Sequence, residues 1–170
     1  PNLDRLAAHG VTFDNAYCTS PICTPSRMSM LTAKHPHKTQ VWGNNDILRS
    51  GTPTMAHSLG AAGLDPSLVG RLHSVGPDQL LGYSERLVGD HHENWAGLPR
   101  KNMGPLEGCA SPDRRSLKNS GIGQSSYEVK DRDVTAAALE RLEKIAAEMS
   151  SGDRERFAMT VGYMLPHAPF

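Results

Sequence analysis

Residues 23–33 read Cys-Thr-Pro-Ser-Arg-Met-Ser-Met-Leu-Thr-Ala, and the fold is best argued outward from this stretch. Proline suits the first turn of a helix, because its missing N–H would have no partner there. We therefore predict a helix from Pro25 to about Thr32, with Cys23 just ahead of it. Free backbone N–H groups and the positive end of the helix dipole favour an anion at that point. Arg27, one turn later, adds a positive charge that persists at any working pH.

The flanking segments predict a layered α/β domain. The clearest helix is expected at 131–149, where apolar residues recur on one face, and the residues of this stripe are Val134, Ala138, Leu142, Ile145 and Met149. Residues 157–164 then read as a short apolar strand, suited to a sheet covered on both faces. Shorter helices are predicted at 2–9 and 53–62, and a short strand at 11–13. A helix followed by a buried strand favours an α/β layer architecture.

The long stretch 64–127 is weakly patterned, with recurring Gly, Pro, Ser and Asn. We expect surface loops there, with short strands or turns. Pro66 should weaken any strand that enters from 64–66, because proline cannot donate to a sheet ladder. A stretch of this kind is usually functional or disordered, and in this chain it could shape a substrate pocket.

Composition excludes several classes of function. The 170 residues are 38% hydrophobic and 21% charged, with a formal net charge of +0. This balance gives no indication of nucleic-acid binding or of attraction to an anionic membrane. No run approaches the roughly eighteen consecutive apolar residues of a membrane span. Because the chain starts at Pro1 and stops in a Pro-rich segment at Phe170, we expect a fragment truncated at both ends.

The cysteines Cys18, Cys23 and Cys109 are too few and too irregular for a disulfide framework. We predict Cys18 and Cys109 to be buried structural thiols, the ordinary state of an isolated cysteine. The same ordinary reading for Cys23 is a packed side chain in a Pro-rich loop. The motif that follows Cys23 favours a nucleophile instead.

The pattern Cys-x-Pro-Ser-Arg at 23–27, followed after three residues by Leu-Thr at 31–32, resembles the signature of formylglycine-dependent (type I) sulfatases. Ala33 stands where that family has glycine. Gly-Arg-Leu-His at 70–73 corresponds to the family's Gly-Lys-x-His, and 74–79 resembles a branch that includes choline-sulfatase-like and bacterial glycan-sulfatase-like enzymes. Other segments also resemble the family, at 1–13, 15–17, 53–63, 131–138 and 162–170. Residues 91–125 carry little of the resemblance.

This resemblance implies a partial sulfatase catalytic domain over 1–170, with an alkaline-phosphatase-like α/β fold and a mostly parallel central sheet. It implies that a formylglycine-generating enzyme oxidises Cys23 to 3-oxoalanine, which hydrolyses sulfate esters as a covalent catalyst. The modified Cys23 would also be a ligand of a divalent metal, usually Ca²⁺. The family's other metal ligands come from an Asp pair upstream of Pro1 and from an Asp–Asn or Asp–His pair beyond Phe170. A fragment without them should be inactive.

The resemblance also suggests roles for individual residues. Arg27 belongs to the catalytic motif, and Arg71 would contact sulfate, although it cannot shuttle a proton as the family's lysine can. His73 would handle the nucleophile's hydroxyl, while His167 would contact sulfate and protonate the leaving oxygen. The ordinary alternative for each histidine is a surface or hydrogen-bonded core residue. For His91-His92-Glu93, an exposed loop is favoured over a metal site.

Three functions stay open at this point. The first is hydrolysis of a sulfated small molecule or glycan, with periplasmic or secreted localisation favoured and the cytoplasm open for a choline-sulfatase-like enzyme. The second is hydrolysis of a phosphonate monoester or phosphodiester within the same superfamily, because sulfate and phosphate esters are both tetrahedral anions. The third is a non-catalytic descendant that binds sulfated ligands, suggested by Arg71, Ala33 and 64–66.

Overall fold

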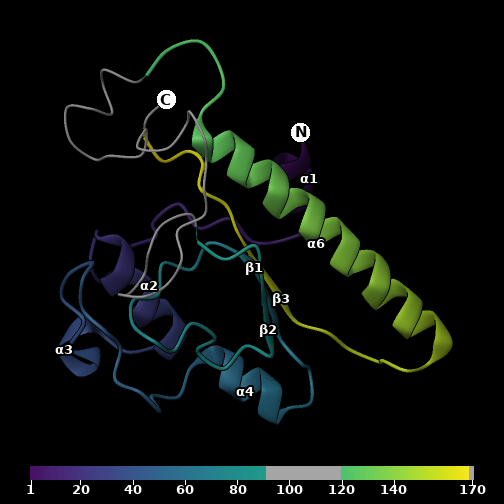
Figure 1. The fold of residues 1–170 in the computed structure, drawn as a ribbon, viewed down its shortest axis with the longest axis horizontal. Helices are drawn as coiled ribbons and strands as arrows, with labels where there is room; N and C mark the ends of the chain where they lie inside the picture. The colour runs from purple at the N-terminus through teal and green to yellow at the C-terminus, as the bar shows by residue number, and fades with distance from the viewer. Residues whose placement is uncertain (91–119, 169–170) are drawn as a thin grey trace.

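The computed structural model describes residues 1–90 and 120–168, and its centre is a parallel sheet (Figure 1). The strands are β1 (Ser67–Gly70), β2 (Glu85–Leu87) and β3 (Met159–Gly162), in the order β2-β1-β3. Ser67 of β1 pairs with Glu85 of β2 and with Met159 of β3. The parallel sheet and the helices around it confirm the predicted α/β class.

Helices cover both faces of β1. The helices α2 (Cys23–Thr32), α3 (Pro36–Thr39) and α4 (Met55–Ala61) lie on one side of the sheet, and α6 (Ser126–Ser151) lies on the other (Figure 1). Successive strand residues point to opposite faces, so Leu68 joins the core with α2 and α4, and Val69 packs against α6. All four residues of β1 are buried, as in a strand covered on both sides. The buried strand was instead predicted at 157–164, where β3 lies at an edge of the described sheet and its four residues are only half-buried.

The helix α6 is longer than the predicted 131–149. Its start is set by a capping box, in which the Ser125 side chain accepts from the Glu128 N–H and the Glu128 side chain accepts from the Ser125 N–H. Gly152, in the left-handed conformation, ends it. Of the predicted apolar stripe, Val134, Ala138 and Ile145 are buried. Leu142 and Met149 are partly exposed, so the prediction of a buried apolar stripe was only partly right.

Other predicted boundaries needed correction. The strand expected at 11–13 does not form, and Val11 and Phe13 are 80% and 76% exposed. Helix α4 begins at Met55 instead of Pro53, because Thr54 caps it and accepts from the His57 N–H. The strand expected at 157–164 shortens to β3. Strand β1 begins directly after Pro66, so the proline bounds this strand and does not disrupt it.

The first 22 residues pack little against the rest of the described chain. The helix α1 (Asn2–Ala8) has no buried residue, and Leu3 and Tyr17 are 81% and 90% exposed. Cys18 is also exposed, so its prediction as a buried thiol was wrong. Cys109 and 91–93 lie outside the described residues. Among the helices that the structure describes, none has the length and apolar character to cross a bilayer.

Candidate active site

Cys23 is the first residue of α2, two positions earlier than the predicted helix start. Ile22 before it is extended and acts as the N-cap, and its carbonyl accepts from the Ser26 N–H. The Cys23 thiol is free and half-buried. The thiol therefore lies at the N-terminal end of the helix, where the dipole favours a negative charge.

Thr24 joins the start of α2 to the segment after β1. Its side chain is fully buried, and its Oγ1 donates to the His73 carbonyl oxygen over 3.3 Å. Its backbone N–H donates to Asn44 Oδ1 at 3.0 Å. The Thr24 contacts bring the nucleophile candidate and the histidine candidate together, although they are far apart in the sequence.

Arg71 and His73 follow directly on β1, at its carboxyl end. Arg71 is 5% exposed, and its Nη2 lies 3.9 Å from Cys23 Sγ and 3.0 Å from His73 Nδ1. A guanidinium only donates, so Nδ1 of His73 must be the acceptor. The Nε atom of Arg71 is buried and makes no hydrogen bond within the part of the chain that the structure describes.

A pair of glycines allows β1 and β3 to approach each other closely at the point where Arg71 follows β1. A Cβ on Gly162 of β3 would lie 1.9 Å from the Arg71 carbonyl oxygen, and one on Gly70 would lie 2.3 Å from the Gly162 carbonyl oxygen. Gly70 also has a φ of 86°, which L side chains rarely adopt. The two strands can converge at their carboxyl ends only because neither residue carries a side chain.

Two arginines make the surroundings of Cys23 electropositive. Burial lowers the pKa of Arg27, and the nearby charge of Arg71 lowers it further, while Cys23 and Asp90 act in the opposite direction. Crowding of two cations around a half-buried thiol is unfavourable unless an anion joins them. The arrangement therefore suits an anionic ligand at the N-terminus of α2.

His167 reaches this region through Tyr127. The two rings meet edge to face, with centroids 5.5 Å apart, and Tyr127 is only 3% exposed. Burial raises the pKa of the Tyr127 phenol, and the charges of Arg71 and Cys23 also act on it, in opposite directions. The segment before His167 is held by Asp131 of α6, which accepts from the N–H groups of Met164 and Leu165 at 2.7 and 3.0 Å.

The described residues do not form a metal centre. In 1–90 and 120–168, no group of three or more His, Cys, Asp or Glu side chains is placed to hold a metal ion. The charged neighbours of Cys23 include Arg27 and Arg71, which repel a cation. This part of the chain therefore does not fit a divalent cation on its own.

The structure places Cys23, Arg27, Arg71 and His73, which come from two separate motifs at 23–27 and 70–73, near one another. Their chemical roles stay predictions. Sequence reasoning missed Asn44, Arg86, Asp90 and Tyr127. A single carboxylate or phenol in a loop or capped helix carries no local signal, and only the tertiary contacts reveal these residues.

Comparison with known proteins adds independent information. A family model described as Sulfatase matches residues 1–170. The chain is 32% identical to the choline-sulfatase of Rhizobium meliloti (strain 1021), over 100% of this chain and 34% of that protein. It is 27% identical to human iduronate 2-sulfatase, over 100% of this chain and 31% of that protein. It thus spans about a third of the length of these curated relatives.

The fold has solved counterparts. A structure described as a 2-O GAG sulfatase superposes with a TM-score of 0.56 at 21% identity, over 96% of this chain and 29% of that one. At this identity the likeness concerns the fold alone. It supports the predicted alkaline-phosphatase-like architecture.

Proposed function

Because this chain belongs to the sulfatase family, we propose that the protein hydrolyses sulfate esters and that Cys23 is the precursor of its nucleophile. The observation that carries the proposal is the position of Arg71. Its guanidinium is buried, it lies 3.9 Å from Cys23 Sγ, and its Nε makes no hydrogen bond among the described residues. A buried donor without an acceptor is costly, and a bound anion would remove that cost.

The anion would bind between the N-terminus of α2 and the two arginines. Arg71 presents a planar fork suited to two oxygens of one tetrahedral group. Arg27 supplies a second charge from the following turn of α2. Oxidation of Cys23 by a formylglycine-generating enzyme would supply an aldehyde, which hydrates to a geminal diol. One hydroxyl would attack sulfur as the alcohol leaves, and the second would then lose its proton and expel sulfate, which restores the aldehyde.

The two histidines would manage protons on either side of the bound ester. Arg71 donates to His73 Nδ1, so proton exchange with the nucleophile would go through Nε2 of His73. His167 would protonate the leaving oxygen. Its Nδ1 lies 2.7 Å from the Ala168 carbonyl oxygen, which favours a hydrogen on Nδ1 and leaves Nε2 as the nitrogen for that exchange.

We extend the proposal to a divalent cation, with Ca²⁺ implied by the family resemblance. Among the described residues the family resemblance assigns the modified Cys23 as a ligand, and no step above passes through a metal. The substrate class is a sulfated small molecule or glycan. The similarity to a choline-sulfatase supports a small sulfated alcohol, and the similarity to iduronate 2-sulfatase supports a glycan.

A second candidate is hydrolysis of a phosphodiester or phosphonate monoester. The observation that favours it is again Arg71, which stands where the family's motif has lysine. A guanidinium fork binds phosphoryl oxygens in a bidentate way as readily as sulfuryl oxygens. Rates on 4-nitrophenyl sulfate and on bis(4-nitrophenyl) phosphate would separate the two candidates.

The test of the proposed function is the state of Cys23 in the full-length protein, co-expressed with a formylglycine-generating enzyme. Conversion of thiol to aldehyde lowers the mass of the Cys23 peptide by about 18 Da. We expect this loss together with sulfatase activity, and we expect Cys23→Ala to abolish the activity. Cys18→Ala is the matched control, because Cys18 is an exposed thiol outside the motif. Its removal should change neither the mass loss at Cys23 nor the sulfatase activity. An unmodified Cys23 with activity equal in Cys23→Ala would refute the proposal.

A further inference from the structure

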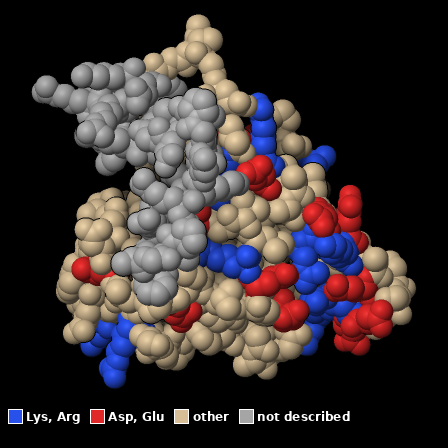
Figure 2. Space-filling view, in the orientation of Figure 1, with Lys and Arg blue, Asp and Glu red and all other residues tan. Residues whose placement is uncertain are grey.

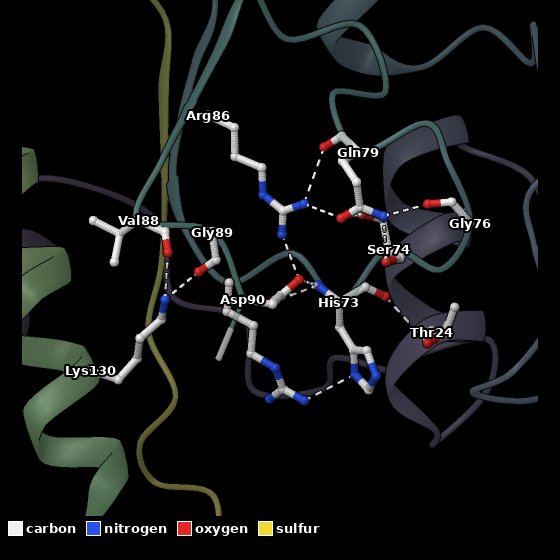
Figure 3. Close-up of polar contacts among 11 residues, drawn as sticks. Thr24, His73, Ser74, Gly76, Gln79, Arg86, Val88, Gly89, Asp90 and Lys130 are labelled. Carbon is white, nitrogen blue, oxygen red and sulfur yellow. Dashed lines mark hydrogen bonds and ion pairs between the residues drawn. The ribbon is translucent and has the colours of Figure 1, made fainter. Parts of the chain in front are cut away.

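A buried ion pair lies directly behind His73. Arg86 Nη2 contacts Asp90 Oδ2 at 2.5 Å, and the two side chains are only 9% and 1% exposed. The Asp90 carboxylate in turn accepts from the His73 backbone N–H, at 3.1 and 3.4 Å to its two oxygens. Figure 3 shows the Arg86 guanidinium, the Asp90 carboxylate and the His73 backbone in one continuous chain of contacts.

His73 needs such support because its backbone is strained. Its φ is 56°, in the left-handed region that residues with a side chain rarely occupy. A residue stays in this region only where its surroundings determine the conformation strongly. Asp90 holds the His73 N–H, and Thr24 holds the His73 carbonyl. Both polar groups of the strained residue are thus bound from different segments.

Asp90 is itself anchored from two sides. Arg86 Nη1 donates to the Gln79 carbonyl at 3.2 Å and to Gln79 Oε1, so one guanidinium joins Asp90 to the loop after His73. On the other side, the fully buried Lys130 of α6 donates to the Val88 carbonyl at 2.9 Å and to the Gly89 carbonyl (Figure 3). Val88 has a φ of 65°, which a β-branched residue rarely adopts, so this turn also needs external support.

We infer that Asp90 is a positioning residue, held by Arg86, which fixes His73 so that its ring meets Arg71, the residue that contacts Cys23. The inference rests on the proposed function, because positioning matters only if His73 takes part in the reaction. It goes beyond that function by assigning a role to the Arg86–Asp90 ion pair, which contacts the His73 backbone. A displacement of about 1 Å at a reacting group can cost on the order of 10²-fold in rate.

The test compares Asp90→Ala with Asp90→Asn in the full-length protein, using 4-nitrophenyl sulfate as the substrate. For Asp90→Ala we expect kcat to fall roughly 30- to 100-fold with KM changed less than about threefold, because His73 is proposed to move a proton and not to bind the sulfate. Asp90→Asn should recover a large part of kcat, because its amide oxygen can still accept from the His73 N–H.

Glu85→Gln is the matched control. Glu85 precedes Arg86 on β2, so its side chain points to the opposite face, where it contacts Arg141 Nε at 2.6 Å and accepts from Ser67 Oγ. The Glu85→Gln substitution breaks an ion pair on the same strand as Arg86 without touching His73. The kcat of this variant should equal that of the wild type. Hydrogen exchange at the His73 amide should accelerate in Asp90→Ala and not in Glu85→Gln.

Two results would overturn the positioning role. One is a wild-type kcat in folded Asp90→Ala. The other is an equal loss of kcat in Glu85→Gln, which would show a general effect of weakening the sheet. If Asp90→Ala does not fold, Arg86→Lys decides, because lysine keeps the charge but cannot span Gln79 and Asp90, and an unchanged kcat would refute the inference. Failure of the proposed function would be seen earlier and separately, in the wild type and in Cys23→Ala.

Discussion

At the scale of single residues, Arg71 combines three properties that act on the site together. It carries a permanent charge, it is buried, and it donates to the ring nitrogen of His73. A lysine at this position would be a compact charge on a flexible stem and could release a proton. Arg71 therefore supports anion binding and fixes the hydrogen-bonding state of His73, but it cannot act as a proton shuttle.

We predict that Arg71→Ala will lower kcat/KM for an aryl sulfate by roughly 10- to 100-fold, the loss expected for removing charge-assisted hydrogen bonds of about 1.5–3 kcal/mol. Arg71→Lys should recover part of the loss through its charge. Steady-state kinetics on both variants check this expectation. Arg132→Ala is a suitable control, since Arg132 is an exposed arginine of α6. Equal kcat/KM in wild type and Arg71→Ala would contradict the assignment of Arg71 to the anion site.

At the scale of elements, the site is assembled where several segments end. The strand β1 delivers Arg71 and His73, the helix α2 begins at Cys23, and α6 begins near Tyr127. In open parallel sheets, ligands bind outside the carboxyl ends of the strands, which is where Arg71 and His73 lie. The close contact between β1 and β3 at Gly70 and Gly162 sets the positions of these residues.

We predict that Gly162→Ala will destabilise the protein by about 3 kcal/mol or more, because its new Cβ would overlap the backbone of Arg71 and neither strand can yield. Chemical denaturation should show a lower midpoint, and sulfatase activity should fall with it. Gly121→Ala is the control, since a Cβ there would meet nothing within 4 Å. Equal stability of the two variants would show that the β1–β3 contact is looser than the structure indicates.

The carboxyl end of α6 carries a cluster of ion pairs with a defined response to pH. Figure 2 shows acidic and basic residues interleaved over the side of the molecule where α6 lies. Arg154 contacts Glu148 at 2.5 Å and Asp65 at 3.2 Å. The hydrogen bond from Arg154 lowers the pKa of Glu148, and hydrogen bonds from Ser84 and then Arg154 lower the pKa of Asp65.

We predict that Arg154→Met will narrow the difference in stability between neutral and acidic solution. A carboxylate whose pKa is lowered by folding stabilises the protein above its unfolded pKa of about 4, and this stabilisation disappears as pH falls through the folded pKa. The variant lacks the arginine that lowers the pKa values of both Glu148 and Asp65. It should therefore be less stable than the wild type at pH 7 and approach the stability of the wild type below about pH 4. The effect should be modest and weaken with added salt, because Asp65 is exposed and Glu148 is partly exposed.

Thermal unfolding of wild type and Arg154→Met across this pH range checks the expectation. Lys144→Met is the matched control, because Lys144 pairs with Glu140 on the same helix and should change the profile in the same direction but without involving Asp65. If the melting temperatures of the wild type and Arg154→Met differed by the same amount at every pH, the proposed origin of the effect would be contradicted.

At the scale of the whole molecule, apolar side chains gather on the surface of the first 22 residues. They include Leu3, Leu6, Val11, Phe13 and Tyr17, each more than two-thirds exposed. Single apolar residues are normal on a surface, but several large exposed ones in one short segment favour a contact with other protein surface. Within the described residues nothing buries this segment.

We predict that the 170-residue chain, produced alone, will self-associate through this segment. The double variant Leu6→Lys and Phe13→Ser should shift it toward the monomer, because it places polar groups within the apolar surface. Size-exclusion chromatography with light scattering measures the change. Ile122→Ser is the control, since Ile122 is fully exposed but lies outside the cluster. A monomeric wild-type chain at high concentration would contradict the prediction.

Much of the architecture followed from local patterns. The spacing of Val134, Ala138 and Ile145 predicted α6, although the capping box at Ser125 and Glu128 extended it. The helix α2 was predicted to start at Pro25. It starts at Cys23 instead, because the backbone of Ile22 before it is extended. The strand expected at 11–13 failed because alternation of apolar residues cannot form a strand without a neighbour to pair with.

The sequence by itself determined the nucleophile candidate and the family, because a short motif with its spacing is a local property of the chain. It also identified Arg71, His73 and His167 as candidates through the segments that resemble the family. Only the tertiary structure decided that Arg71 points at Cys23, that Tyr127 lies against His167, and that Asp90 holds His73. These contacts join segments distant in sequence, and so does the close approach of β1 and β3 at Gly70 and Gly162, so no local pattern encodes any of them.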